Sequence, residues 1–180
     1  DTSNCTSSEA AAIASYMQKL RTDYINLGFA TPILEPSSSK YNIYITPNSK
    51  PGDSNTLASA FMVNYSGNKC ASYIVVYNYS SITNILKETL SHEYFHAIQN
   101  AYNCTSGWFK EACANWGGTM VSGYDENAGR WFHNFLLDPT RTINKVSGYY
   151  SYFLPYCMQK DYGGVATVVE FYNLYSNCSK

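Results

Sequence analysis

The chain has 180 residues and a mass of 20.2 kDa, which suits one domain that buries roughly 70% of the surface its unfolded form exposes. Its net charge is −1 and only 14% of its residues are charged, without a basic block, so neither nucleic acid nor an anionic membrane is expected as a partner. No run of about eighteen apolar residues occurs, which argues against a membrane-spanning helix and for a soluble protein.

Helix and strand patterns alternate in the first half of the chain. An Ala-rich segment with an apolar stripe, ending at Gly28, predicts a helix over residues 7–27. Alternating or β-branched segments predict strands over residues 41–46, 57–65 and 71–78. The last of these is apolar enough to be the central strand of a sheet.

The second half of the chain reads as helical. Residues 81–102 predict one helix capped by Ser81. Further helices are expected over residues 108–121, 129–137, 149–161 and 164–175. The fold class is therefore α+β, with a small mixed sheet first and a mainly helical C-terminal half. We expect one domain, residues 1–180, made of an N-terminal subdomain (1–102) and a helical C-terminal subdomain (103–180).

Cysteine usage indicates an oxidising compartment. The number of cysteines is even, and none forms the close Cys-x-x-Cys pair of a structural zinc site. We therefore expect three disulfides and a secreted, extracellular protein. The chain begins without an apolar leader, so we expect a mature form. The cysteines are Cys5, Cys70, Cys104, Cys113, Cys157 and Cys178.

The helix predicted over residues 81–102 carries two histidines, His92 and His96, with Glu93 directly after the first. Residues four apart on a helix are neighbours, with Cβ atoms about 5 to 6 Å apart, so both imidazoles can bind one ion about 2 Å away. Glu93 is turned about 100° from His92, which suits a general base better than a ligand. This is the HExxH pattern of zinc-dependent hydrolases, and we expect Zn²⁺ at His92 and His96.

A catalytic zinc needs a third protein ligand and leaves a fourth position for water. The metzincin pattern would place that ligand at Tyr102 and a glycine at Gln99, so that pattern fails. Glu111 is favoured, because a helix entered through the turn at residues 103–107 would run back beside the first helix. The other downstream candidates are His133, Asp125, Glu126, Asp138, Asp161 and Glu170.

The segment WFKEACANW, from Trp108 to Trp116, resembles the W-x-x-E-x-x-A segment of the gluzincin metallopeptidases. With HExxH, the resemblance covers residues from about 81 to 175 and implies a zincin-like fold in which Glu111 is the third zinc ligand. Many gluzincins have an acidic residue four positions beyond that glutamate. Here the position holds Asn115, which could accept a hydrogen bond from a ligand histidine or be a plain surface amide.

Gluzincins of the aminopeptidase type also resemble this chain in a tyrosine near the start of a helix that ends in Gly-Gly. Tyr149, followed by Gly163 and Gly164, fits this pattern and is the expected oxyanion donor. Simple aromatic packing of Tyr149 remains an alternative. His133 is a second candidate for the oxyanion, although its surroundings suit a structural histidine.

These residues predict a secreted zinc-dependent endopeptidase that is a monomer and acts on a protein or peptide substrate. Glu93 would remove a proton from the zinc-activated water, and the substrate would extend along the strand at residues 57–65. An aspzincin-type peptidase with Asp125 as third ligand is one alternative, although its Gly-Thr-x-Asp context is missing. A zinc-containing binding module or toxin without peptidase activity is another, and a hydrolase of non-peptide amides or esters a third.

Overall fold

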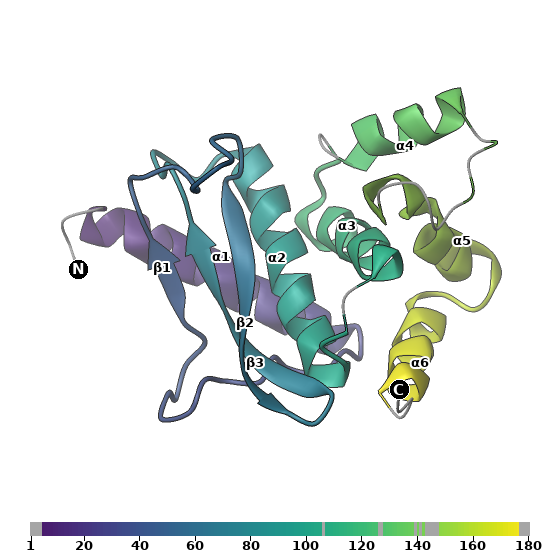
Figure 1. The fold of residues 1–180 in the computed structure, drawn as a ribbon, viewed down its shortest axis with the longest axis horizontal. Coiled ribbons are helices and arrows are strands. Elements are labelled where there is room, and N and C mark those ends of the chain that lie inside the picture. Colours follow the sequence, from purple (N-terminus) through teal and green to yellow (C-terminus); the bar gives the residue numbers. More distant parts are fainter. Residues whose placement is uncertain are drawn as a thin grey trace.

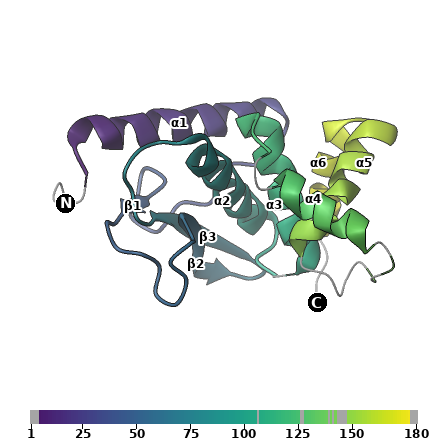
Figure 2. The same ribbon diagram turned by 90° about the horizontal axis from the view of Figure 1, so that it is seen from above.

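The structure is a computed structural model that describes residues 5–105, 107–125, 128–138, 140, 142 and 148–176. A three-stranded sheet and two long helices form the first half, and shorter helices form the second (Figure 1). Figure 2 shows helix α2 (Asn84–Tyr102) between the sheet and helix α1 (Ser7–Asn26). One hydrophobic core includes residues of both halves, from Ile13 to Tyr172. The α+β class and the small sheet are therefore confirmed.

Helix α1 (Ser7–Asn26) begins with a capping box. The Thr6 side chain accepts from the backbone of Glu9, and the Glu9 carboxylate accepts from the backbone N–H of Thr6 at 2.7 Å. These bonds satisfy backbone donors that a helix start leaves without partners. The apolar stripe faces inward and ends at Tyr24, and Gly28, with φ of 95°, turns the chain away. The predicted helix is confirmed.

The sheet contains strands β1 (Ile43–Ile45), β2 (Ala58–Ser66) and β3 (Lys69–Val76) in the order β1-β3-β2. Strand β1 pairs with β3 in parallel and β2 pairs with β3 antiparallel, so the sheet is mixed as predicted. The strand predicted over residues 71–78 is central, and its side chains alternate towards a fully buried core at Ile74 and Val76. Strand β2 lies at an edge of the sheet.

Helix α2 (Asn84–Tyr102) begins three residues later than predicted. The Thr83 side chain accepts a hydrogen bond from Leu86 N at 3.1 Å and caps the helix, which leaves Ser81 in the preceding extended segment. The helix packs on the sheet, on α1 and on helix α3, so most of its surface is buried.

Helix α3 (Trp108–Ser122) lies against α2 at a distance that two glycines permit. A Cβ atom on Gly118 would lie 3.0 Å from the backbone nitrogen of His92, and one on Gly117 would lie 2.6 Å from the Phe95 ring. Larger residues at either position would push the helices apart. The pair Gly117-Gly118 therefore sets the close approach of α3 to the part of α2 that carries the histidines.

The remaining elements are α4 (Ala128–Leu137), the 3₁₀ helix η1 (Gly148–Ser151), α5 (Phe153–Asp161) and α6 (Val165–Tyr175). The single helix expected over residues 149–161 is thus two elements. Pro155 has no N–H to donate to Ser151, and its ring would clash with that carbonyl in a continuous α-helix. The chain instead restarts at Phe153, which places Pro155 in the first turn of α5, where proline is tolerated.

One disulfide joins Cys70 of β3 to Cys104, just after α2. Cys5, Cys113 and Cys157 are free thiols, and Cys178 lies outside the described residues, so the expectation of three disulfides is wrong. Cys113 is fully buried among apolar side chains, where it packs as a small hydrophobic residue. No helix in the described ranges is long and apolar enough to cross a membrane.

Candidate metal centre

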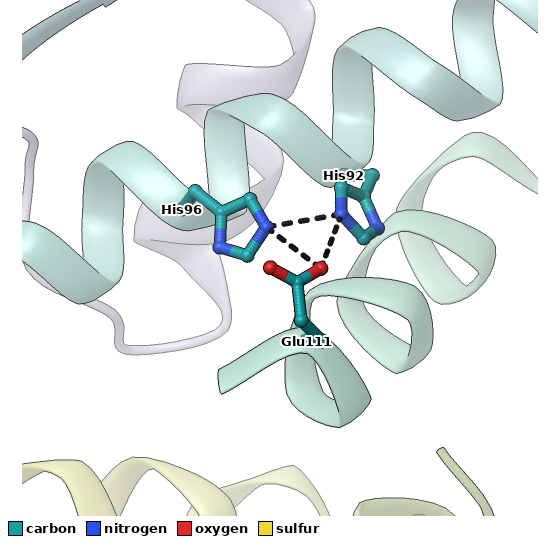
Figure 3. Close-up of side chains that lie close together, drawn as sticks. All are labelled: His92, His96 and Glu111. Carbon is teal, nitrogen blue, oxygen red and sulfur yellow. Dashed lines mark hydrogen bonds and ion pairs between the residues drawn. The ribbon is translucent and has the colours of Figure 1, made fainter. Parts of the chain in front are cut away.

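Three side chains converge where α2 meets α3: His92, His96 and Glu111. The two histidine Nε2 atoms are 3.0 Å apart, and Glu111 Oε2 lies 3.3 Å from each of them. Figure 3 shows both imidazoles projecting from one helix towards the carboxylate on the next. The structure therefore brings together the two histidines and the glutamate that the sequence predicts as ligands.

The spacing of these three atoms fits a metal ion. Ligands about 2.0 to 2.1 Å from a tetrahedral ion lie about 3.3 to 3.4 Å from one another, close to the observed triangle. Glu111 Oε2 is buried and has no hydrogen-bond partner. A buried carboxylate oxygen without a donor is costly, by about 1 to 3 kcal/mol or more, and a cation would satisfy it. The group can thus hold a metal ion.

The charges of the three ligands are coupled. Burial alone would lower the pKa of His96, but the neighbouring Glu111 carboxylate outweighs it and the pKa is raised. Burial likewise opposes ionisation of Glu111, but the His92 and His96 rings, 3.3 Å from its Oε2, hold the pKa of Glu111 well below its ordinary value. Glu111 is therefore an anion at neutral pH, the form in which a carboxylate binds a cation.

Gln99 fixes the orientation of His96. Gln99 Nε2 donates to the backbone oxygen of Lys110 at 2.8 Å, and because that oxygen can only accept, the amide is oriented unambiguously. The same nitrogen also donates to the Tyr172 hydroxyl at 2.7 Å. Gln99 Oε1 therefore faces His96 Nδ1, 2.7 Å away, and accepts its proton. His96 Nε2 is left with the free electron pair that a metal ligand needs.

Glu93 lies at the end of the site nearest the sheet. Its Oε2 accepts a hydrogen bond from the backbone N–H of Ala60 in β2 at 2.7 Å. Glu93 and His92 line a cleft of about 350 Å³, whose other walls include Ser59 and Asn115. Glu93 is not one of the three converging residues, which agrees with the prediction that it is turned away from the ligand axis.

Tyr149, in η1, lies on the same cleft. Its ring stacks on that of His92, with centroids 5.7 Å apart and an angle of 19° between the planes. The pKa of Tyr149 is raised by burial, by the negative charges of Glu111 and Glu93, and by a side-chain hydrogen bond with Glu111. The hydroxyl therefore remains a protonated donor at neutral pH.

Gly148 is a residue of the site that the sequence did not single out. A Cβ atom there would overlap the backbone oxygen of Trp108 and approach the Cβ of Glu111 to 2.6 Å. Only glycine lets η1 lie this close to the first turn of α3. Gly148 therefore allows Tyr149 and Glu111 to occupy their places together, and no local sequence signal indicates this.

The other sequence candidates that the structure describes lie elsewhere or have other contacts, and Glu126 lies outside the described residues. Asn115 lines the cleft, but its amide donates to the backbone oxygen of Tyr149 at 3.3 Å and does not meet a histidine. Asp125 is exposed in the loop after α3, and His133 is exposed on α4. The Tyr102 hydroxyl accepts from the backbone N–H of Ala30 at 2.9 Å, which is a structural role.

No protein-family model, no curated protein and no solved structure matches the chain. The fold and the site define an α+β chain with a His-His-Glu group that could hold a metal ion.

Proposed function

We propose that the chain is a secreted zinc-dependent endopeptidase of the gluzincin type. The observation that carries the proposal is the triangle of two imidazole nitrogens and one carboxylate oxygen, with Glu93 beside it in an open cleft. A His-His-Glu set leaves one position of a tetrahedral ion for water, which distinguishes catalytic from structural zinc sites. The Cys70–Cys104 disulfide supports an extracytoplasmic location.

His92, His96 and Glu111 would hold the ion. Bound zinc supplies a Lewis acid that polarises the scissile carbonyl and acidifies a water molecule. Gln99 keeps His96 in the tautomer that presents Nε2, and the stacked ring of Tyr149 limits rotation of His92. The chain thus contributes ligands whose orientation is fixed before the substrate binds.

Glu93 would carry the proton. Its carboxylate removes a proton from the attacking water and returns it to the leaving amine nitrogen. The hydrogen bond from Ala60 N–H holds one oxygen of Glu93 against β2 and leaves the other for this transfer. Tyr149, kept protonated by its raised pKa, would donate to the oxyanion that forms on the substrate.

The substrate would extend along the open edge of β2. Leu57 accepts from Tyr77 N in the neighbouring segment, whereas Ala60 N–H points to Glu93. Since backbone groups alternate along a strand, the N–H and C=O groups of Ala58, Ala60 and Met62 face away from β3. Except for the Ala60 N–H, which is bonded to Glu93, these groups can pair with an extended peptide, which suits an internal segment of a protein substrate.

The test compares wild type with Glu93→Gln and Glu111→Gln in casein cleavage, with zinc content measured by mass spectrometry. We expect Glu93→Gln to keep its zinc and to lose activity by at least about a hundredfold, because only the proton carrier is removed. Glu111→Gln should lose both zinc and activity. A Glu93→Gln variant that remains fully active would exclude this mechanism.

Asp125→Asn serves as the matched control, because it also converts one carboxylate to an amide on the segment after α2. We expect it to keep zinc and activity. Loss of zinc in Asp125→Asn but not in Glu111→Gln would favour the aspzincin-type site. Wild-type protein that binds zinc stoichiometrically but cleaves no peptide library would instead indicate a zinc-containing binding module.

A further inference from the structure

A second hollow lies on the side of α2 away from the metal ligands. It has a volume of about 540 Å³, within the range of small-molecule sites. Its walls come from α1, from the segment that leads into β1, and from α2, and they include Met17, Arg21, Pro32, Leu34, Lys40 and Tyr94. No residue is shared with the cleft beside the metal ligands. We call this hollow the back cavity.

The back cavity is lined by two cations, Arg21 and Lys40, and by no acidic residue. The nearby carboxylates are bound elsewhere, since Asp23 pairs with Lys19 and Glu35 accepts from Asn42 Nδ2 at 2.6 Å. Within the described part of the chain, neither the Arg21 guanidinium nor the Lys40 ammonium has a hydrogen-bond or ion-pair partner. The cavity therefore presents uncompensated positive charge beside an apolar wall.

A largely buried tyrosine, Tyr94, also lines the cavity. Tyr94 is only 3% exposed, and its ring is held by Tyr24, stacked at 6.1 Å, and by Tyr41, edge-on at 5.5 Å. Tyr41 has a partner for its own hydroxyl, Ser72 Oγ at 3.2 Å. The Tyr94 hydroxyl has none among the described residues, and Arg21 lies within electrostatic reach of it. The hydroxyl oxygen is not sealed from solvent, so it is open to the cavity and can donate a hydrogen bond to a molecule bound there.

We propose that the back cavity binds a small amphipathic carboxylate. The apolar body lies against Met17, Pro32 and Leu34, and the carboxylate meets Arg21 and Lys40 and accepts a hydrogen bond from the Tyr94 hydroxyl. One carboxylate would thus provide a partner for the Arg21 guanidinium, the Lys40 ammonium and the Tyr94 hydroxyl. The proposal does not depend on the peptidase function, because Tyr94 is turned about 200° from His92 on α2.

The test is calorimetric titration of zinc-loaded and chelator-treated protein with decanoate, below its micelle concentration. N-acetyl-Leu-Leu, which ends in a free carboxylate, is the second probe, so that a fatty acid and a peptide end are compared as sources of the same chemistry. Decyltrimethylammonium supplies an apolar chain with the opposite charge. We expect saturable binding of at least one carboxylate at one site, with or without zinc, and none of the cation.

Two variants and a matched control locate the binding. The double change Arg21→Gln with Lys40→Gln should weaken carboxylate binding at least about tenfold, because two charged partners are lost. Tyr94→Phe keeps the ring and should weaken binding by about threefold to tenfold. Lys160→Gln removes an exposed charge from α5, outside the cavity, and should change nothing.

Equal binding of decanoate and decyltrimethylammonium, or no saturable binding of either carboxylate, would overturn the proposal. So would a Lys160→Gln variant that weakens binding as much as the double change does. The variants at Arg21, Lys40 and Lys160 alter exposed side chains, so far-ultraviolet circular dichroism should confirm the wild-type fold in each.

Discussion

The two halves of the metal site are built in different ways. The α2 half, with His92, His96 and Gln99, lies on one helix buried between the sheet, α1 and α3. The other half, with Glu111 and Tyr149, comes from the first turn of α3 and from the short helix η1. In the α2 half, helical periodicity alone sets the spacing of the side chains. In the α3 half, contacts between separate elements set it, chiefly where Gly118 meets His92 and Gly148 meets Glu111.

This difference indicates where the site should depend on its metal. The two histidines remain neighbours as long as α2 is folded. Glu111 and Tyr149 remain near them only while α3 and η1 stay packed, and an ion that binds all three ligands ties the two halves together. We therefore expect the α3 half to be the less stable of the two without metal.

Removal of the proposed zinc ion should have the largest effect. A ligand present at about a thousand times its dissociation constant stabilises the folded protein by about 4 kcal/mol. For a chain of this size, a chelator should therefore lower Tm by roughly 8 to 16 °C. Hydrogen exchange should accelerate more in residues 108–111 and 148–151 than in the centre of α2. Equal acceleration in both halves would show that α3 and η1 depend on the metal no more than α2 does.

Gly148→Ala should have the next largest effect. The added methyl group collides with the backbone of Trp108 and with Glu111, so η1 must move away from α3. Overpacking of this kind costs about 1 to 3 kcal/mol in the free energy of unfolding, and zinc affinity should fall with it because Glu111 is displaced. Urea denaturation and a competitive zinc titration measure the two effects.

Gly107→Ala is the matched control for Gly148→Ala. Gly107 precedes the same first turn of α3, and an added Cβ would have no heavy atom within 4 Å. Its φ of 174° is extended backbone that alanine also adopts. We expect stability and zinc affinity close to those of wild type. If Gly107→Ala weakens zinc binding as much as Gly148→Ala does, the close contact at Gly148 does not explain the effect.

The sequence predicts the α2 half of the site better than the α3 half. HExxH and its helix are local patterns, so His92, His96 and the placement of Glu93 could be predicted. The role of Gln99 could not, because it depends on hydrogen bonds to Lys110 and Tyr172, which lie 11 and 73 residues further along the chain. The expectation of three disulfides failed because an even count of cysteines carries no information about burial, and Cys113 is a core residue. Glu111 is favoured by helix order and by the resemblance to the gluzincin segment, whereas the glycines that bring it close carry no local signal.

Gln99→Leu should have the smallest effect of the three and should act chiefly through His96, although it also removes the hydrogen bond to the Lys110 carbonyl on α3. Leucine has a similar size but removes the acceptor of the His96 Nδ1 proton, so the ring can rotate or carry its proton on Nε2 instead. Loss of such a hydrogen-bond partner lowers metal affinity by about 10-fold to 100-fold.

Gln99→Glu keeps an acceptor for His96 but cannot donate to the Lys110 carbonyl. Because the acceptor is kept, its zinc affinity should lie closer to wild type than that of Gln99→Leu. A zinc titration of both variants with a competing chromophoric chelator measures their zinc affinities and shows which variant binds more weakly. If Gln99→Leu binds zinc as tightly as wild type, the packing of α2 alone sets the orientation of His96. The α2 half of the site would then need no hydrogen bond from another element, unlike the α3 half.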